Sequence, residues 1–406
     1  MMWSPTGKPV APSNAPRCGA TSRPPGAGGT TGWAHGQGRG PMVGSKALSV
    51  TFVVMAGGKG ERLWPLVRAS TPKVCLSPNG SRSLLEATID RLRPIWPRAS
   101  WLIVTTQEQA AAVRRALPAP LRRAVLVEPQ GRNTAACITL AAVALAVRDP
   151  RRVMVVVPAD HWIGDVRAFR RAVRSAIHAA VSQDTLATIG IRPTHPHVGL
   201  GYLCAGSPLA GDRQRGVFRL ERFIEKPSRA LAKRLIKRAG TYWNSGIFVG
   251  MADTFLGCVT EWLPDHTRYL VPLATSLRRE RSLGTASFAR RARRAYGTLQ
   301  AVSFDHGVMD HFHGGLVVAG RFPWADLGSW DVWARLGQVA PRTVAIESQN
   351  VTVVGQPDHL IATVGVCDLL VVQTPSATLI CRAGRAQAVR QVVKRLSTDP
   401  RLAPYR

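Results

Sequence analysis

An alternation of apolar runs and helical patterns constrains the fold of this chain most. Four runs are rich in Val, Ile and Leu on both faces: residues 48–55, 101–106, 124–127 and 153–157. Three helical patterns separate them: residues 84–92, 107–116 and 135–147. Strands that are buried on both faces and joined by helices are typical of parallel sheets. We therefore predict an α/β fold with a Rossmann-like, mostly parallel sheet and helices on both of its faces.

The character of the chain changes after about residue 335. Short β-branched runs separated by Gly, Asp or Pro replace the helical periodicity: residues 351–354, 360–364, 369–373 and 377–381. A helical pattern returns at residues 385–396. Evenly spaced runs of this kind are what the rungs of a short solenoid produce. We predict an α/β domain at residues 47–340 and a small β-helix-like module with a closing helix at residues 341–406.

Residues 1–46 differ from the rest of the chain. They are rich in Gly, Pro, Ser and Thr, and they contain five Lys or Arg and no acidic residue. Such a segment buries too little apolar surface to offset the entropy of ordering it. We predict a disordered basic tail. An alternative is that translation begins at Met42 and that the tail is not made.

The formal net charge of the chain is +30, with 54 Lys+Arg against 24 Asp+Glu. An excess of this size permits binding to nucleic acid. Arginines account for 46 of the basic residues, and they are scattered over the whole chain. Scattering favours compositional drift, so we expect no nucleic-acid partner. A nucleic-acid binder would instead gather its arginines on one face.

Cysteine usage and hydropathy indicate the compartment. The seven cysteines are odd in number and form no closely spaced pair, which argues against a disulfide framework and a thiolate zinc site. The longest nearly apolar run, residues 135–147, is too short to span a bilayer. The N-terminus lacks the apolar stretch of a secretory signal. We expect a cytoplasmic protein without membrane association.

The first chemical motif is a glycine-rich turn after the strand at residues 48–55. Its loop residues are Ala56, Gly57, Gly58 and Gly60. Glycines let backbone amides approach an anion closely. Arg62 can donate two parallel hydrogen bonds to phosphate oxygens, and Lys73, after Pro72, adds a compact positive charge. The order of residues is not that of a P-loop, yet the pattern predicts a phosphate-binding site.

Two aspartates are candidate metal ligands. Asp160 follows the carboxyl end of the apolar strand at residues 153–157, where a carboxylate can hold Mg²⁺ against phosphates. The alternative for Asp160 is a helix N-cap. Asp326 lies between two tryptophans and precedes Gly328, and its alternative is a turn-forming aspartate.

Polar residues in two further regions are candidates for substrate contact. Glu225 and Lys226 follow a strand; adjacent strand residues point to opposite faces, so we expect each to serve a separate ligand and not to pair. The alternative is a solvated ion pair. Asn244 can contact a hydroxyl pair or act as a turn amide. Asn133 and Thr134 begin an apolar helix, where free amides favour anions, although Thr134 could be its N-cap.

These motifs occur in the order found in the sugar-1-phosphate nucleotidyltransferases, and the chain resembles that family over roughly residues 50–396. The matching segments are residues 55–66, 71–73, 128–135, 158–161, 199–202, 223–227, 243–248 and 324–330. The later segments resemble the guanylyltransferases of the family that use mannose 1-phosphate. Residues 304–310 (Phe-Asp-His-Gly-Val-Met-Asp) depart from the family's Ile-Asp-Tyr-Ala-Val-Met-Glu.

The resemblance implies a nucleotidyltransferase domain at residues 47–340 that makes GDP-mannose and pyrophosphate from GTP and α-D-mannose 1-phosphate, by Mg²⁺-assisted in-line attack on the α-phosphorus. It implies a catalytic group of Arg62, Lys73, Asp160, Lys226 and Asp326, with the metal on Asp160 and Asp326. The nucleotide-binding group is Ala56, Gly57, Gly58, Gly60, Arg62, Glu128, Gly131, Asn133 and Thr134. The sugar-phosphate group is Gly201, Glu225, Lys226 and Asn244.

Two other functions stay open at this point. One is the same chemistry with a different sugar or nucleotide, and the other is a non-catalytic sugar-nucleotide binder. Some relatives carry a fused phosphomannose isomerase, and the 406 residues leave no room for it, so we expect a single activity. The C-terminal module resembles the short left-handed β-helix of relatives, which is compatible with a homo-oligomer.

Overall fold

The computed structural model describes residues 48–68, 71–78, 81–211, 216–279, 286–334 and 342–406. The predicted tail and the predicted domain boundary after residue 340 lie outside these residues. Within the described residues, no helix is both long enough and apolar enough to cross a bilayer.

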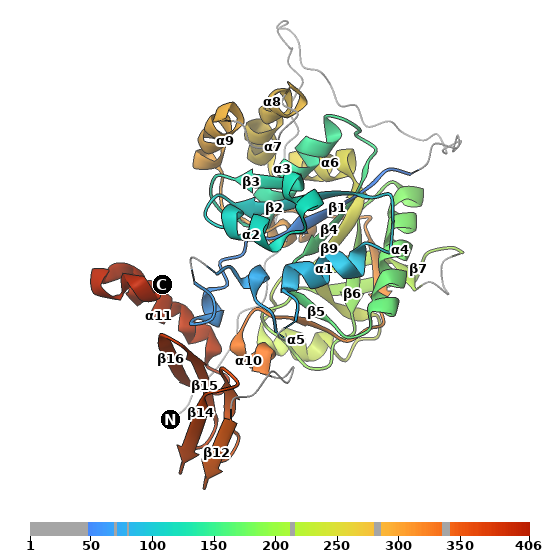
Figure 1. Cartoon of the computed structure of the whole chain (residues 1–406). Coiled ribbons are helices and arrows are strands. Elements are labelled where there is room, and N and C mark those ends of the chain that lie inside the picture. Colours follow the sequence, from blue (N-terminus) through green and yellow to red (C-terminus); the bar gives the residue numbers. More distant parts are fainter. Residues whose placement is uncertain (1–47, 69–70, 79–80, 212–215, 280–285, 335–341) are drawn as a thin grey trace, which may run out of the picture. The chain divides into compact units, whose positions relative to one another are not determined.

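A nine-stranded sheet forms the centre of the α/β part (Figure 1). In spatial order its strands are β3 (Val125–Glu128), β2 (Ser100–Thr106), β1 (Val50–Met55), β4 (Val153–Pro158), β9 (Thr241–Met251), β6 (Ala187–Ile191), β10 (Leu316–Gly320), β8 (Val217–Ile224) and β7 (Tyr202–Pro208). β8 and β9 are antiparallel to their neighbours, and the other strands share one direction. The prediction of a mostly parallel α/β sheet is confirmed.

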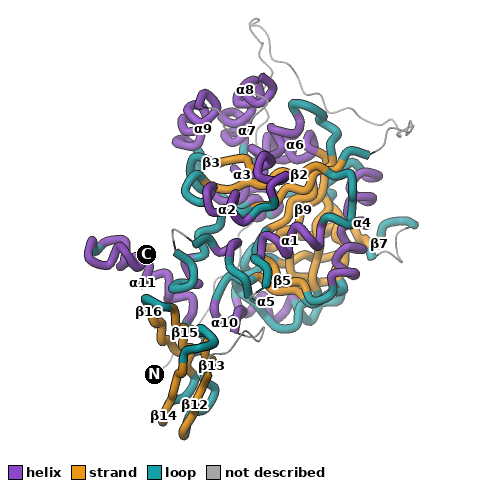
Figure 2. The backbone as a smooth tube through the Cα atoms, viewed as in Figure 1, coloured by secondary structure: helices purple, strands orange, loops and turns teal. Residues whose placement is uncertain are grey.

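Helices cover both faces of this sheet (Figure 2). They are α1 (Leu84–Leu92), α2 (Ala110–Ala116), α3 (Asn133–Ala146), α4 (Val166–Gln183), α5 (Arg229–Leu235), α6 (Ala252–Trp262), α7 (Pro264–Leu270), α8 (Ala274–Arg279) and α9 (Ala286–Thr298). Two consecutive residues of β4 show the two layers. Val155 packs with Phe169 of α4 in one buried cluster, whereas Val156 packs with Leu140 of α3 in the other. The strand is apolar on both sides because each side faces a helix layer.

The central strands end together, and this positions the candidate site. In the registers of β1, Met55 lies opposite Val104 of β2 and opposite Pro158 of β4. The glycine-rich turn and Asp160 therefore leave the same edge of the sheet. The carboxyl ends of parallel strands are where α/β proteins bind their ligands.

A two-stranded ribbon lies beyond this edge. Its strands are β5 (His161–Ile163) and β11 (Trp324–Asp326), which pair antiparallel. The short helix α10 (Trp330–Trp333) follows β11.

The C-terminal module is built from short strands and a closing helix. Its elements are β12 (Arg342–Ile346), β13 (Thr352–Val354), β14 (Leu360–Val364), β15 (Leu369–Thr374), β16 (Ala377–Arg382) and α11 (Val389–Thr398). β12 pairs with β14, and β13 with β15, in parallel, as successive rungs do. β15 and β16 form an antiparallel hairpin, so the rung pattern stops there.

A third apolar cluster joins this module to the turn that carries Arg62. Leu63 and Trp64, next to Arg62, pack with Trp330 of α10 and with Leu370 and Val389 of the module. The indole of Trp330 donates to the carbonyl of Trp64 at 2.9 Å. The indole of Trp64 donates to the carbonyl oxygen of Tyr405 at 2.8 Å. The glycine-rich turn is thus held by α10 and by residues of the C-terminal module.

We expect Trp330→Phe to lower the free energy of unfolding by about 2–3 kcal/mol, because it leaves the buried Trp64 carbonyl unpaired and opens a cavity. Chemical denaturation measures this loss. Trp262→Phe is the control, since Trp262 is 37% exposed and should cost less than about 1 kcal/mol. Equal losses in both variants would contradict the role given to Trp330.

Candidate active site

A buried lysine brings the two predicted metal ligands together. Lys73 is 4% exposed, and its Nζ lies 2.5 Å from Asp160 Oδ2 and 3.5 Å from Asp326 Oδ1. Burial alone would lower the pKa of Lys73, but the two carboxylates outweigh burial and raise it. Burial favours protonation of Asp160, yet Lys73 outweighs it and lowers the pKa of Asp160 to about 2. Lys73 and Asp160 are therefore both charged near neutral pH.

The ribbon explains how residues so distant in sequence meet. Asp326 lies opposite His161 in the β5–β11 register, and Asp160 directly precedes His161. The helix-cap alternative for Asp160 is wrong, because the chain continues into β5 and α4 is capped by Asp165, which accepts from Ala168 N at 2.9 Å. The turn alternative for Asp326 is also wrong, because Asp326 is the last residue of a paired strand.

The same residues fit a divalent cation. One ligand atom each from Asp160, His161 and Asp326 lie within 4.8 Å of one another. His161 is 6% exposed, and its buried Nδ1 has no hydrogen-bond partner among the described residues. Carboxylate oxygens are the ligands that Mg²⁺ prefers, and an unpartnered buried ring nitrogen gains from a cation or a donor. This donor set suits a single metal ion.

The glycine-rich turn lies against the lysine. Gly60 has a φ of 61°, and a Cβ there would lie 2.8 Å from the Cβ of Lys73, so only glycine fits. Arg62 belongs to the same turn. A Cβ on Gly328 would lie 2.9 Å from Arg62 Nη2 and 3.0 Å from Asp326 Oδ2, which places both groups beside Gly328. Burial lowers the pKa of Arg62, although nearby Asp326 opposes it.

Glu128 is a buried carboxyl beside this turn. It is 3% exposed, its Oε1 accepts from the hydroxyl of Tyr296 at 3.1 Å, and a Cβ on Gly57 would lie 3.7 Å from its Oε2. Burial raises the pKa of Glu128 to about 8, and the Tyr296 hydrogen bond only partly opposes this. Glu128 is therefore a largely protonated acid near neutral pH in the free protein.

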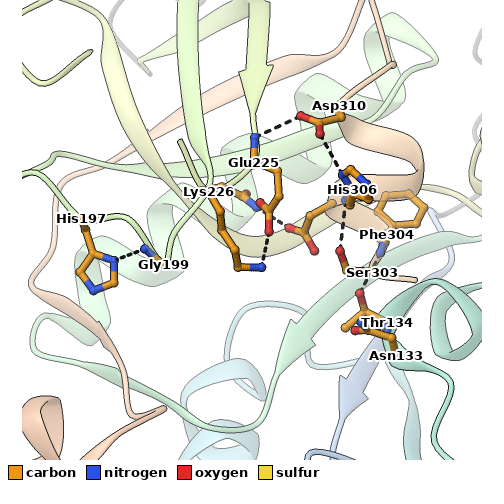
Figure 3. Close-up of polar contacts among 12 residues, drawn as sticks. Asn133, Thr134, His197, Gly199, Glu225, Lys226, Ser303, Phe304, His306 and Asp310 are labelled. Carbon is orange, nitrogen blue, oxygen red and sulfur yellow. Dashed lines mark hydrogen bonds and ion pairs between the residues drawn. The ribbon is translucent and has the colours of Figure 1, made fainter. Parts of the chain in front are cut away.

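At the start of α3, the N-cap alternative for Thr134 is wrong. The N-cap position is Arg132, whose side chain makes no cap hydrogen bond but donates from Nε to the Tyr296 carbonyl at 2.9 Å. Thr134 is not the N-cap; its hydroxyl accepts from Phe304 N at 2.8 Å (Figure 3). Asn133 has a φ of 64°, and its Oδ1 accepts from Thr134 N. The segment is braced by residues from much later in the chain.

The expectation that Glu225 and Lys226 do not pair is wrong. Lys226 Nζ lies 2.5 Å from Glu225 Oε1 (Figure 3). β8 ends at Ile224, and Lys226 has a φ of 41°, so the alternation of a strand no longer applies. Gly201 approaches the same carboxylate closely, because a Cβ there would lie 2.8 Å from Glu225 Oε2. Glu225 N also donates to Asp310.

Asn244 does not sit in a turn; it lies within β9 and is 6% exposed. Its Nδ2 donates to Asp305 Oδ1 at 2.6 Å, and its Oδ1 accepts from the Thr188 hydroxyl at 3.0 Å. Asp305, in a π-helical turn, is a candidate site residue that the sequence analysis did not select. Burial, together with the nearby Glu225, raises the pKa of Asp305 to about 6. A usable signal was the presence of two acids, Asp305 and Asp310, in residues 300–312, a segment without any Lys or Arg.

A cavity of about 180 Å³ is lined both by residues of the β5–β11 ribbon and by residues around Asn244. Seven predicted or newly identified site residues line it: Thr134, Gly201, Glu225, Lys226, Asn244, Asp305 and Asp326. His161 and Trp324 of the ribbon also line it. The predicted residues of the glycine-rich turn, together with Lys73, Glu128, Gly131, Asn133 and Asp160, do not line this cavity. A ligand that filled the cavity would meet Asp326 of the ribbon as well as Asn244 and Asp305.

We expect Glu128→Gln to raise the free energy of unfolding at pH 9 but not at pH 4. Between the ordinary carboxyl pKa of 4.5 and the folded value of about 8, the folded state holds the extra proton, so this group's contribution to stability falls as pH rises. Glutamine removes that dependence. Urea denaturation at several pH values measures it, with Glu108→Gln at an exposed position as control. If the free energies of unfolding of Glu128→Gln and the wild type differed by the same amount at every pH, the raised pKa of Glu128 would be contradicted.

Comparisons with known proteins identify the relatives of this chain. Residues 51–336 match the family model described as nucleotidyl transferase, and residues 341–396 match the MannoseP isomerase/GMP-like beta-helix domain. The mannose-1-phosphate guanylyltransferase of Escherichia coli K12 is 34% identical over 359 residues, which cover 86% of this chain and 74% of that protein. The alginate biosynthesis protein AlgA of Pseudomonas aeruginosa is 33% identical over 357 residues, which cover 86% of this chain and 72% of that protein.

A solved structure shares both the fold and the sequence pattern. A crystal structure from Thermus thermophilus, described as a mannose-1-phosphate geranyltransferase, is 34% identical with a TM-score of 0.72, and the match covers 86% of this chain and all of that one. The β-helix-like interpretation of the C-terminal module is confirmed by the second family match. The chain therefore belongs to the nucleotidyl transferase family.

Proposed function

We propose that this protein is a mannose-1-phosphate guanylyltransferase, which joins GTP and α-D-mannose 1-phosphate into GDP-mannose and releases pyrophosphate. One observation carries the proposal: Asp326, which belongs to the Asp160–Lys73–Asp326 cluster, lines the same cavity as the polar groups Glu225, Asn244 and Asp305. Cations and a metal site suit phosphates, and carboxylates and an amide suit a sugar. Two relatives named mannose-1-phosphate guanylyltransferase, each 34% identical over 86% of this chain, support the choice of substrates.

The chemistry needs positioning and charge neutralisation more than proton transfer. An oxygen of the sugar phosphate attacks the α-phosphorus of GTP in line, a P–O bond forms, and the bond to the leaving pyrophosphate breaks. The attacking phosphate is already ionised at neutral pH, so no general base is required. Lys73 and Arg62 neutralise charge on the triphosphate, and Lys226 neutralises charge on the sugar phosphate. Mg²⁺, held by Asp160 and Asp326 with His161 beside them, would supply further positive charge.

The buried Glu128 accounts for the choice of guanine. Its carboxyl lies beside the glycine-rich turn, which would hold the nucleotide. Guanine presents two adjacent N–H donors on its pairing edge, and a carboxylate accepts from both. Guanine would therefore compensate the cost of burying the ionised Glu128 carboxylate. A base without two adjacent donors would leave a carboxylate oxygen without a hydrogen-bond partner. Glu128 therefore favours guanine over uracil and thymine.

The sugar end offers acceptors at fixed positions. Glu225 is held by Lys226, and Asn244 is held by Thr188 and Asp305. Groups whose rotamers are fixed by neighbouring hydrogen bonds lose little entropy when a hydroxyl binds. We assign Glu225 and Asn244 to the sugar hydroxyls, and Gly201 to close backbone approach.

The remaining assignments follow from composition and burial. The described cysteines are free, which suits a reducing cytoplasm: Cys75, Cys137, Cys204, Cys258, Cys367 and Cys381. The partners are small molecules and not nucleic acid. Apolar side chains of β12 and β14 are exposed, among them Val344 and Leu360, which suits a homo-oligomer.

We expect pyrophosphate release from GTP with mannose 1-phosphate to fall well over tenfold in Asp160→Asn and in Asp326→Asn, at least about 1.4 kcal/mol of barrier. A coupled phosphate assay measures it. Asp184→Asn is the control, since Asp184 pairs with Arg151 at the surface. Full activity in either site variant would refute the metal assignment. Equal turnover of the wild-type enzyme with UTP or dTTP would remove the guanylyl specificity, and glucose 1-phosphate tests the sugar in the same way.

We expect Gly328→Ala to lower kcat/KM by about tenfold or more, since an added methyl displaces Arg62 or Asp326. Gly257→Ala is the matched control, because nothing lies within 4 Å of the Cβ it would add. Steady-state kinetics on both variants measures the effect on catalysis. Their melting temperatures show whether the loss comes from displaced side chains or from an unfolded protein. Unchanged kcat/KM in Gly328→Ala would show that these two groups tolerate the shift.

A further inference from the structure

The C-terminal module reaches the arginine assigned to catalysis. Arg62 donates from Nη1 to Oε1 of Gln387 at 3.3 Å. Gln387 lies in a short 3-10 turn, Ala386–Ala388, that leads directly into α11. The apolar cluster of Leu63 and Trp64 with Val389 fixes this approach. A residue of the predicted C-terminal module therefore contacts a residue assigned to the triphosphate.

Arg390 stands one turn beyond Gln387. Residues three apart on a helix share a face, so Arg390 lies on the side that meets Arg62. Its charge is close enough to help burial lower the pKa of Arg62, against the opposing effect of Asp326. Arg390 is exposed, and no hydrogen bond or ion pair of its side chain occurs among the described residues.

The segment of the module that carries Gln387 and Arg390 has no acid of its own. Residues 386–398 contain Arg390, Lys394 and Arg395 but no Asp or Glu. The following acid, Asp399, is already paired with Arg401 at 3.0 Å. The charges of Arg390 and Arg62 repel, and Asp326 and Asp160 oppose this effect at Arg62. A polyanion bound by both arginines would be attracted to each of them and would offset their mutual repulsion. A guanidinium group can also donate two parallel hydrogen bonds to phosphate oxygens.

We propose that Arg390 binds the pyrophosphate portion of the triphosphate together with Arg62, and that Gln387 is a positioning residue that holds Arg62 for this contact. The C-terminal module then completes the nucleotide site. This rests on the proposed function for the identity of the nucleotide. The ligand chemistry itself is common to any nucleoside triphosphate and to free pyrophosphate.

The test uses the full chain and a charge-matched control. Arg390→Gln should raise the KM for GTP, and the KM for pyrophosphate in the reverse reaction, by about tenfold, with the KM for mannose 1-phosphate unchanged. Calorimetry with pyrophosphate should show the same loss of affinity without any turnover. Arg395→Gln removes the same charge from the same helix and should change neither value. Equal effects of both variants, or an unchanged pyrophosphate affinity in Arg390→Gln, would overturn the proposal.

Gln387→Met tests the positioning role with a side chain of similar size that lacks the acceptor. We expect the KM for pyrophosphate to rise about threefold, with the KM for mannose 1-phosphate and the melting temperature unchanged. Gln391→Met, at an exposed position of α11, is the control. A parallel change in both KM values would indicate a merely structural role and overturn the assignment. Failure of the proposed substrates would instead appear in the wild-type enzyme, whereas pyrophosphate calorimetry would still report on Arg390.

Discussion

The ion cluster of Lys73 with Asp160 and Asp326 is the interaction on which the site depends. A buried ammonium requires partners, because an uncompensated charge away from water is far more costly than a paired one. The two carboxylates come from the end of β4 and from β11, more than 160 positions apart in the chain, so their meeting requires the complete sheet and the ribbon. Gly60 makes the close approach of the glycine-rich turn possible. The interaction that joins these elements also brings together the two carboxylates proposed to hold the metal.

The fold was largely predictable from local patterns. The helix expected at residues 84–92 coincides with α1, because its apolar positions repeat with helical period and Ser83 caps it. The reversal of β8 and β9 was not expected, since strand order and direction are set by contacts between distant segments. The pairing of Glu225 with Lys226 was missed because the positive φ of Lys226 is set by tertiary structure, as no glycine or asparagine marks it.

The site was predictable only in part, for a similar reason. Motif order pointed to Asp160 and Asp326, but the three-residue strands that join them are too short to leave a periodic signal. Asp305 was missed because a buried acid next to an aromatic residue resembles an ordinary turn in sequence. Its role became visible through Asn244, which it holds by a hydrogen bond. Sequence patterns identify residue types that suit a reaction, whereas their mutual support comes from packing.

The apolar cluster shared by the glycine-rich turn, α10 and the C-terminal strands has a consequence for folding. Two segments that match different families are ordinarily expected to melt separately. Here the indole groups of Trp64 and Trp330 lose their surroundings as soon as either segment opens. The loss of one segment's contacts therefore removes stability from the other, and the two behave as one cooperative unit. In evolutionary terms, exchanging the module for another would require redesigning the glycine-rich turn that packs against it.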